Sequence, residues 1–126
     1  MIDAQAPAHY RWDDLELEPL KGSITRRMIT GTSMMIAEVR LGKGEIVPQH
    51  AHHNEQITYI TQGALRFTLG ENGDRVVTVR AGEVLVIPSH LPHAAEALED
   101  TIDIDIFSPP REDWLNGTDG YLRGGT

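Results

Sequence analysis

The sequence predicts an all-β protein, a sandwich or barrel of short strands in a single domain. Apolar or alternating stretches of four to seven residues recur along most of the chain, and Gly or Pro separates them at short intervals. No long helical period occurs, except over one or two turns at residues 111–115. A length of 126 residues fits one domain of ordinary size.

The composition excludes several classes of function. Hydrophobic residues make up 40% of the chain and charged residues 24%, and the net charge is −8. That charge argues against binding to nucleic acid or to an anionic membrane, and an anionic small-molecule substrate would need a local positive centre. The absence of cysteine excludes disulfides and thiolate metal sites. No signal-peptide pattern and no run of transmembrane length occurs, so a cytoplasmic location is expected.

The chain is expected to have three parts: an N-terminal arm (residues 1–20), a barrel (21–115) and a C-terminal tail (116–126). The first nine residues are Ala-rich and polar and are expected to be loose. The rest of the arm has acidic residues around Leu15 and Leu17 and can pack on the barrel or on a second subunit. The tail contains four glycines and little core material, so it is expected to be flexible.

Eight short strands are expected within the barrel. Gly31 interrupts the first apolar stretch, and Leu-Gly-Lys-Gly from Leu41 marks a turn. Gly-Glu-Asn-Gly from Gly70 is a strong hairpin signal, and Pro88 stops a later strand. The expected strands are residues 24–29, 34–39, 57–60, 64–69, 76–80, 84–87, 94–98 and 101–107.

The sequence His-Ala-His-His-Asn-Glu-Gln, which begins at His50, is the strongest chemical signal. If one strand ran through it without a bulge, alternate side chains would share a face, and His50, His52 and Gln56 would converge. The residues of opposite parity, His53 and Glu55, would point away. Two imidazoles and an amide oxygen form half of a divalent-metal site.

The other half of this metal site is expected from a second turn. Pro-Ser-His-Leu-Pro-His begins at Pro88, and His93 follows a Pro-fixed turn at the start of a strand, where it can face the barrel interior. His90 lies within the turn and is expected to be solvated. A lone histidine such as His9 is more often an ordinary hydrogen-bonded residue than a ligand. His93 is therefore the expected fourth ligand.

The two turns resemble the two sequence motifs of the cupin family. The residues that match the motifs are Gly44, His50, His52, Gln56 and Gly63 in the first, and Gly82, Pro88 and His93 in the second. The resemblance implies a small jelly-roll β-barrel with a metal in its mouth. Many cupins have a Glu ligand near the position of Gln56. Because all four ligands here are neutral, the ion would keep its full charge, which favours proton transfer or anion binding over oxygenase chemistry.

The last expected strand allows two orientations. Ile alternates with Asp over residues 102–106, and this periodicity alone favours Ile inside with Asp103 and Asp105 in water. Phe107 shares the parity of the Asp residues, so that orientation would expose a large aromatic ring. The opposite orientation leaves an Ile face to be covered by the arm or by a subunit partner. A homodimer is the expected cover.

A closer resemblance favours the second orientation. Asp-Ile-Phe-Ser-Pro-Pro-Arg-Glu-Asp-Trp-Leu from Asp105, with the His-rich segment, resembles the pectin-degradation protein KdgF group of cupins over residues 44–115. The resemblance implies that Asp105, Phe107 and Arg111 line the pocket. It also implies one divalent metal ion (Ni, Zn, Co, Fe or Mn) on these ligands: His50, His52, Gln56 and His93. Members of the group convert 4,5-unsaturated monouronates, released from pectin or alginate, to linear keto forms.

The residue types suit that reaction. The metal would stabilise developing negative charge on a substrate oxygen, and Asp105 would move the proton as general acid or base. Arg111 would hold the substrate carboxylate with two parallel hydrogen bonds, and Phe107 would form a wall against the sugar ring. The alternatives are an isomerase or dioxygenase acting on another small oxygen-rich anion, and a non-catalytic cupin that binds a small ligand.

Overall fold

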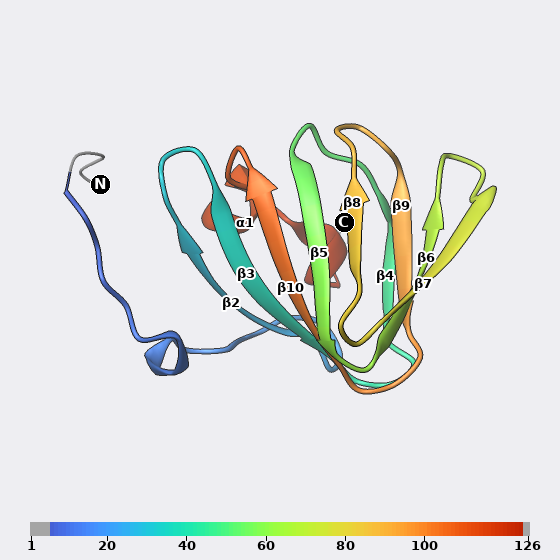
Figure 1. Ribbon diagram of the computed structural model, residues 1–126, viewed down its shortest axis with the longest axis horizontal. Helices are drawn as coiled ribbons and strands as arrows, with labels where there is room; N and C mark the ends of the chain where they lie inside the picture. The colour runs from blue at the N-terminus through green and yellow to red at the C-terminus, as the bar shows by residue number, and fades with distance from the viewer. Residues whose placement is uncertain (1–5, 125–126) are drawn as a thin grey trace.

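Ten strands form two antiparallel sheets in residues 6–124, the part of the chain that the computed structural model describes (Figure 1). One sheet has the strand order β1-β2-β3-β10-β5-β8 and the other β4-β9-β6-β7. The strands are β1 (Glu18–Pro19), β2 (Thr25–Thr30), β3 (Met35–Leu41), β4 (Ile46–His50), β5 (Glu55–Gln62), β6 (Ala64–Leu69), β7 (Arg75–Arg80), β8 (Val84–Ile87), β9 (His93–Ala97) and β10 (Thr101–Ser108). This is the two-sheet architecture of a jelly roll.

In the part of the chain that the structure describes, helical structure is limited to three short segments. The helical elements are η1 (Trp12–Asp14), α1 (Glu112–Asn116) and η2 (Gly120–Leu122). Within residues 6–124, no helix has the length and apolarity needed to cross a membrane.

All eight expected strands are present, and the sequence pattern missed β1 and β4. β4 contains Pro48, which cannot donate a ladder hydrogen bond and argues against a strand. The strand tolerates this proline because β4 lies at the edge of the four-stranded sheet, where its outer side needs no partner.

The core lies between the two sheets and follows from the alternation of side chains along each strand. On β5, Gln56, Thr58 and Ile60 are buried, whereas Ile57 and Tyr59 face solvent. The other strands contribute the aliphatic and aromatic residues that fill the core. The side chains at one end of this core form the site described below.

The three motif glycines adopt conformations that other residues avoid. Gly44, Gly63 and Gly82 have φ angles of 89°, 85° and 87°, in the left-handed region. At Gly63 a Cβ atom would lie 2.4 Å from the backbone oxygen of Asp100, so a side chain there would also clash. The glycine spacing of the two motifs therefore reflects the backbone of the turns.

Strand β10 has the Asp side chains inside. Asp103, Asp105 and Phe107 are 5%, 4% and 1% exposed, and Ile106 is 38% exposed. The orientation implied by the resemblance is thus confirmed, and the preference from periodicity alone is wrong. Burial of the Phe107 ring favours this orientation, and hydrogen bonds from Thr58 and Gln56 to Asp105 compensate one buried carboxylate.

The N-terminal arm and the C-terminal tail each contact the barrel within the described residues. Trp12 in the arm donates a hydrogen bond from Nε1 to Oε1 of Glu38 on β3 at 2.9 Å, so the arm packs on its own barrel at this point. The tail was expected to add little to the core, which is wrong for Asp119 and Leu122, because they are only 1% and 3% exposed. The N-terminal residues and the end of the tail were expected to be loose. Of these, residues 1–5, 125 and 126 lie outside the described residues.

Candidate metal centre and adjoining pocket

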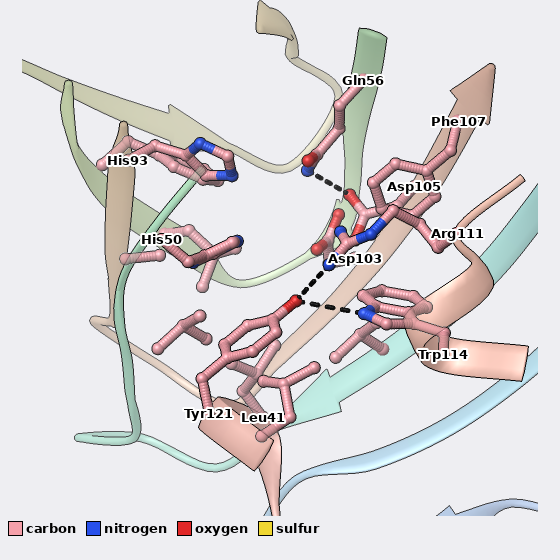
Figure 2. Close-up of a pocket in the computed structure, with 16 residues that line it drawn as sticks. Leu41, His50, Gln56, His93, Asp103, Asp105, Phe107, Arg111, Trp114 and Tyr121 are labelled. Atoms are coloured by element: carbon pink, nitrogen blue, oxygen red, sulfur yellow. Dashed lines mark hydrogen bonds between the residues drawn. The ribbon is translucent and has the colours of Figure 1, made fainter. Parts of the chain in front are cut away.

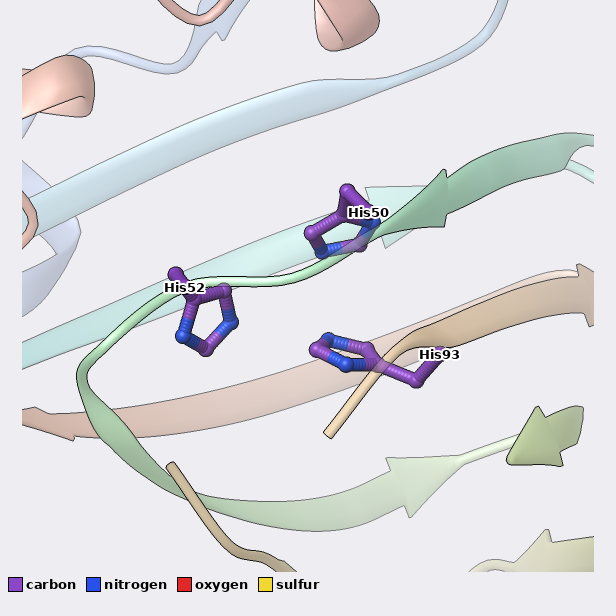
Figure 3. Close-up of side chains that lie close together, drawn as sticks. All are labelled: His50, His52 and His93. Atoms are coloured by element: carbon purple, nitrogen blue, oxygen red, sulfur yellow. The ribbon is translucent and has the colours of Figure 1, made fainter. Parts of the chain in front are cut away.

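Three histidines converge at the upper end of the barrel in Figure 1. His50 ends β4, His93 begins β9, and the two residues are paired across the sheet. His52 lies in the loop after β4, and one ring nitrogen from each histidine lies within 4.8 Å of the others (Figure 3). The expected convergence is present, but the reason given for it is wrong. β4 ends at His50, and residues 51–54 cross to the other sheet, where β5 begins.

Backbone carbonyls fix the orientation of all three rings. Nδ1 of His50, His52 and His93 lies 2.8, 3.0 and 2.9 Å from a carbonyl oxygen two residues away in the chain. A carbonyl oxygen only accepts, so each Nδ1 is the protonated donor and each Nε2 keeps its lone pair. Nε2 of His93 is buried with no hydrogen-bond partner among the described residues. A buried nitrogen with a free lone pair and no hydrogen-bond partner is suited to bind a metal ion.

The surroundings keep the three imidazoles neutral. Burial lowers the pKa of His50 to about 3, with a further contribution from His93. Burial also lowers the pKa of His52 to about 4, assisted by the charge of Arg111, and lowers the pKa of His93. Neutral imidazole is the form that binds a metal, so the rings are ready for an ion at neutral pH.

The Gln56 side chain has a defined orientation beside these rings. Its Nε2 donates to Oγ1 of Thr58 at 2.8 Å and to Oδ1 of Asp105 at 3.3 Å. The amide oxygen therefore faces the histidines, and Oε1 lies 3.1 Å from Nε2 of His52. In a metal site with bonds of about 2.1 Å, ligand atoms on adjacent positions lie about 3 Å apart. The residues present thus fit an ion held by three imidazoles and one amide oxygen.

Two buried carboxylates lie next to Gln56 in the pocket. Asp105 accepts a hydrogen bond from Oγ1 of Thr58 at 2.7 Å, and its pKa is raised by burial. Asp103 is the inward-facing residue before Asp105 on β10, and its Oδ1 is buried without a partner among the described residues. Burial and the neighbouring charge of Asp105 raise the pKa of Asp103 well above its usual value. The pair can therefore hold a proton at a pH where exposed carboxylates have lost theirs.

Arg111 is the residue directly before α1, and its side chain reaches the pocket. Its Nε and Nη2 donate to the two carboxylate oxygens of Asp113 at 3.0 and 2.9 Å, and Nη2 also donates to Oη of Tyr121 at 2.8 Å. The guanidinium lies 5.0 Å from the ring centre of Phe107. The simplest way for an arginine to bind a carboxylate through two nitrogens uses Nε and one Nη. In Arg111 these two nitrogens already bind Asp113.

Two aromatic residues of the site were not predicted from the sequence. The ring of Tyr121 stacks on His50 at 4.3 Å with an interplanar angle of 26°. Trp114 donates from Nε1 to Oη of Tyr121 at 3.0 Å (Figure 2). Burial raises the pKa of Tyr121. The sequence offered only a weak signal, an aromatic residue and Leu122 between glycines in an otherwise polar tail.

These groups surround one hollow between the sheets. Its empty volume, open mouth included, is about 480 Å³. Aliphatic and aromatic side chains from both sheets line it together with the polar groups described above (Figure 2). The remaining histidines, His9, His53 and His90, are exposed and stand outside it. The arrangement can hold a cation, transfer a proton and bind an anion of small-sugar size.

Comparisons with known proteins agree with this architecture. The cupin-domain family model matches residues 37–108. No curated protein matches the chain. The solved structure of KdgF from Halomonas sp. is 31% identical, with a TM-score of 0.78, and the match covers 86% of this chain and 100% of that one. An RmlC-like cupin from Shewanella frigidimarina is 26% identical, with a TM-score of 0.79, over 89% and 99%.

A larger enzyme shares the fold alone. A variant of oxalate decarboxylase from Bacillus subtilis is 22% identical, with a TM-score of 0.72. The match covers 99% of this chain and 40% of that chain, so this chain corresponds to less than half of the decarboxylase. This likeness supports the barrel architecture without bearing on the reaction.

Proposed function

The chain belongs to the cupin family, and on that basis we propose that it is a metal-dependent enzyme that converts 4,5-unsaturated monouronates to their linear keto forms. The sequence resemblance to the KdgF group and the 31% identity to KdgF from Halomonas sp. support the substrate class. The main structural support is Gln56, which joins the histidine cluster to a buried acid by donating to Asp105. An ion and a proton carrier are then adjacent in one pocket.

His50, His52, His93 and Gln56 would hold the ion in this proposal. When bound, a divalent ion would polarise a substrate oxygen and stabilise the negative charge that develops there. Ni, Zn, Co, Fe and Mn all accept imidazole and amide ligands, so the residue set leaves the choice among them open. The four ligands are neutral, so they do not reduce the positive charge of the ion.

The proposed reaction is an isomerisation and needs no co-reactant. The bond between C1 and the ring oxygen breaks, the C1 hydroxyl becomes an aldehyde, and the former ring oxygen becomes an enol at C5. The enol then becomes a ketone as a proton is added at C4. Asp105 suits these proton transfers because its pKa is raised by burial, so it can both hold and release a proton nearer neutral pH.

Two further residues would bind the substrate. The ring of Phe107 lies edge-on to His52 at 5.8 Å and would form an apolar wall beside the sugar ring. The guanidinium of Arg111 is the cationic side chain of the pocket and would attract the substrate carboxylate in a protein of net charge −8.

The test is a direct assay of ring opening. Protein loaded in turn with each of the five metals is incubated with a 4,5-unsaturated monouronate, and loss of the conjugated-alkene absorbance is followed. We expect the reaction to be faster than in buffer. Asp105→Asn should lower kcat by about 10²- to 10⁴-fold while metal content stays unchanged. Asp74→Asn, an exposed carboxylate in the β6–β7 hairpin, is the matched control and should retain full activity.

Three results would contradict the proposal. Absence of acceleration with every metal rejects the activity. Oxygen consumption by the Fe-loaded protein would indicate a dioxygenase instead. A thermal shift on adding the uronate, with no product formed, would indicate a protein that binds the ligand without turnover.

A further inference from the structure

Arg111 keeps few donors for a ligand. A guanidinium has five N–H groups: one on Nε and two on each Nη. Asp113 accepts a hydrogen bond from Nε and another from Nη2. The second hydrogen of Nη2 is donated to Tyr121. Within residues 6–124, no acceptor contacts Nη1. Arg111 alone therefore offers a carboxylate a single nitrogen, and Asp113 already offsets much of its charge.

Tyr121 offers a second donor beside that nitrogen. Its Oη accepts from Nη2 of Arg111 at 2.8 Å and from Nε1 of Trp114 at 3.0 Å. Guanidinium and indole N–H groups can only donate, so neither bond uses the hydroxyl hydrogen of Tyr121. No side chain or carbonyl of the described residues accepts that hydrogen. Two donors on one oxygen also polarise the O–H bond and make it a stronger donor.

The hydroxyl group is held firmly at the pocket. Tyr121 belongs to the C-terminal segment, residues 117–123, which a buried ion pair fixes to the barrel. Arg26, whose side chain is 0% exposed, donates from Nη1 to Oδ2 of Asp119 at 2.7 Å. Arg123 donates to the other oxygen of Asp119 at 2.6 Å. The Tyr121 ring stacks on His50, and its hydroxyl points to Arg111 and Trp114 (Figure 2).

We infer that Tyr121 is a substrate-binding residue that donates its hydroxyl hydrogen to the carboxylate of a sugar acid, beside Nη1 of Arg111. The choice of a sugar acid as ligand rests on the proposed function. Two donors from different residues match the two oxygens of a carboxylate, and both lie near the histidines. The C-terminal segment would thereby determine selectivity for acids over neutral sugars.

The test measures binding, without turnover. Metal-loaded protein is titrated calorimetrically with galacturonate and with galacturonamide, its neutral counterpart. The wild type should prefer the acid. Tyr121→Phe keeps the ring stacked on His50 but removes the hydroxyl, so affinity for the acid should fall about tenfold or more. Affinity for the amide should change less than about twofold. Tyr10→Phe, an exposed tyrosine of the arm, is the control.

The outcomes separate a binding role from a structural one. If Tyr121→Phe weakens acid and amide equally, or weakens neither, the inference is wrong. A wild type that does not prefer the acid also overturns it, whatever its activity. If the wild type prefers the acid and Tyr121→Phe loses that preference, the inference stands even when the unsaturated uronate is not converted. In that case only the proposed function fails.

Discussion

At the scale of single residues, protons and a metal ion compete for the same three imidazole nitrogens. A free histidine has a pKa of 6.5, whereas burial places the pKa of His50 at about 3 and that of His52 at about 4. Protonation of these rings therefore interferes only in acid. We expect metal occupancy to stay constant from pH 8 to about pH 5 and to fall below that.

Equilibrium dialysis against a fixed free-metal concentration, followed by elemental analysis at each pH, measures this occupancy. A loss centred near pH 6.5 would show that the rings titrate like exposed histidines. His52→Ala serves as the comparison, because it removes one of four ligands and should abolish stoichiometric metal at every pH.

Asp103 makes a second prediction at this scale. Its pKa is raised from 3.8 on folding, so the folded state holds a proton that the unfolded state releases above pH 3.8. The contribution of Asp103 to the free energy of unfolding is therefore largest below pH 3.8. It declines as the pH rises towards the pKa that Asp103 has in the folded protein. Asp103→Asn removes the cost of taking up this proton on folding and should raise the free energy of unfolding of the metal-free protein at pH 7 by about 1–3 kcal/mol.

Urea denaturation at pH 4 and pH 7 checks this prediction. The stabilisation by Asp103→Asn should be larger at pH 7, where the wild-type carboxylate is under pressure to ionise. Asp74→Asn, an exposed carboxylate, should have no effect at either pH. Equal or reversed effects of Asp103→Asn at the two pH values would mean that folding does not raise the pKa of Asp103.

The sequence predicted some residues of the site far better than others. His50, His52, Gln56 and His93 follow from the spacing of two local motifs, and the structure brings them together. The inward orientation of Asp105 followed only from the resemblance to a known group of cupins, because the alternation along β10 by itself favoured the opposite face. Tyr121 follows no local pattern, and its place in the site depends on contacts that exist only in the folded chain.

At the scale of elements, strands were predictable and the connections between sheets were not. The alternation and the turn glycines located eight strands, two of them at their observed limits, β6 and β8. β1 is only two residues long and exposed, so no pattern marks it. The crossing between β4 and β5 was missed because a change of sheet over residues 51–54 leaves no periodic signal.

The C-terminal segment gives a prediction at this scale. Arg26 and Asp119 have side chains that are both 0% exposed, so weakening their ion pair leaves a buried charge poorly compensated. Asp119→Asn should lower the free energy of unfolding by about 1–3 kcal/mol. The segment contains none of the four expected ligands, so metal affinity should stay unchanged. Because loosening the segment would displace the Tyr121 hydroxyl, binding of the acid should weaken more than binding of the amide.

Urea denaturation, metal analysis and the two titrations measure these three effects. Asp13→Asn is the matched control, because Asp13 also pairs with an arginine, Arg27 at 3.3 Å, but is 87% exposed. It should change the free energy of unfolding by less than about 0.5 kcal/mol. Loss of metal from Asp119→Asn would show that the segment supports the histidine cluster as well.

At the scale of the whole molecule, the outer faces of the two sheets differ in character. Cross-strand pairing places a row of apolar side chains across the six-stranded sheet, made of Ile29, Ile36, Ile106, Ile57 and Val86. A second row joins Ile104, Tyr59 and Val84. The outer face of the four-stranded sheet instead has an ion pair between Arg66 and Glu96. Among the described residues, the extended apolar surface therefore lies on the six-stranded sheet, and we name it the apolar face.

The apolar face makes a homodimer the expected assembly. Ile36, Ile57 and Ile106 are 38%, 37% and 38% exposed, although they are large aliphatic residues in the middle of a sheet. A contiguous apolar surface of this kind usually marks an interface, and a twofold axis lets one face cover its own copy. The pockets lie between the sheets and would stay open in such a dimer.

Light scattering after size exclusion at micromolar concentration should therefore give twice the chain mass of 14.0 kDa. Ile36→Lys puts a charge within the first row, next to its central residue Ile106, and should give the mass of one chain because the charge would be buried without a partner. Val76→Lys on the other sheet replaces a more exposed aliphatic residue, 57% against 38%, and should remain dimeric. A monomeric wild type, or equal dissociation by both variants, would mean that the apolar face does not form the interface.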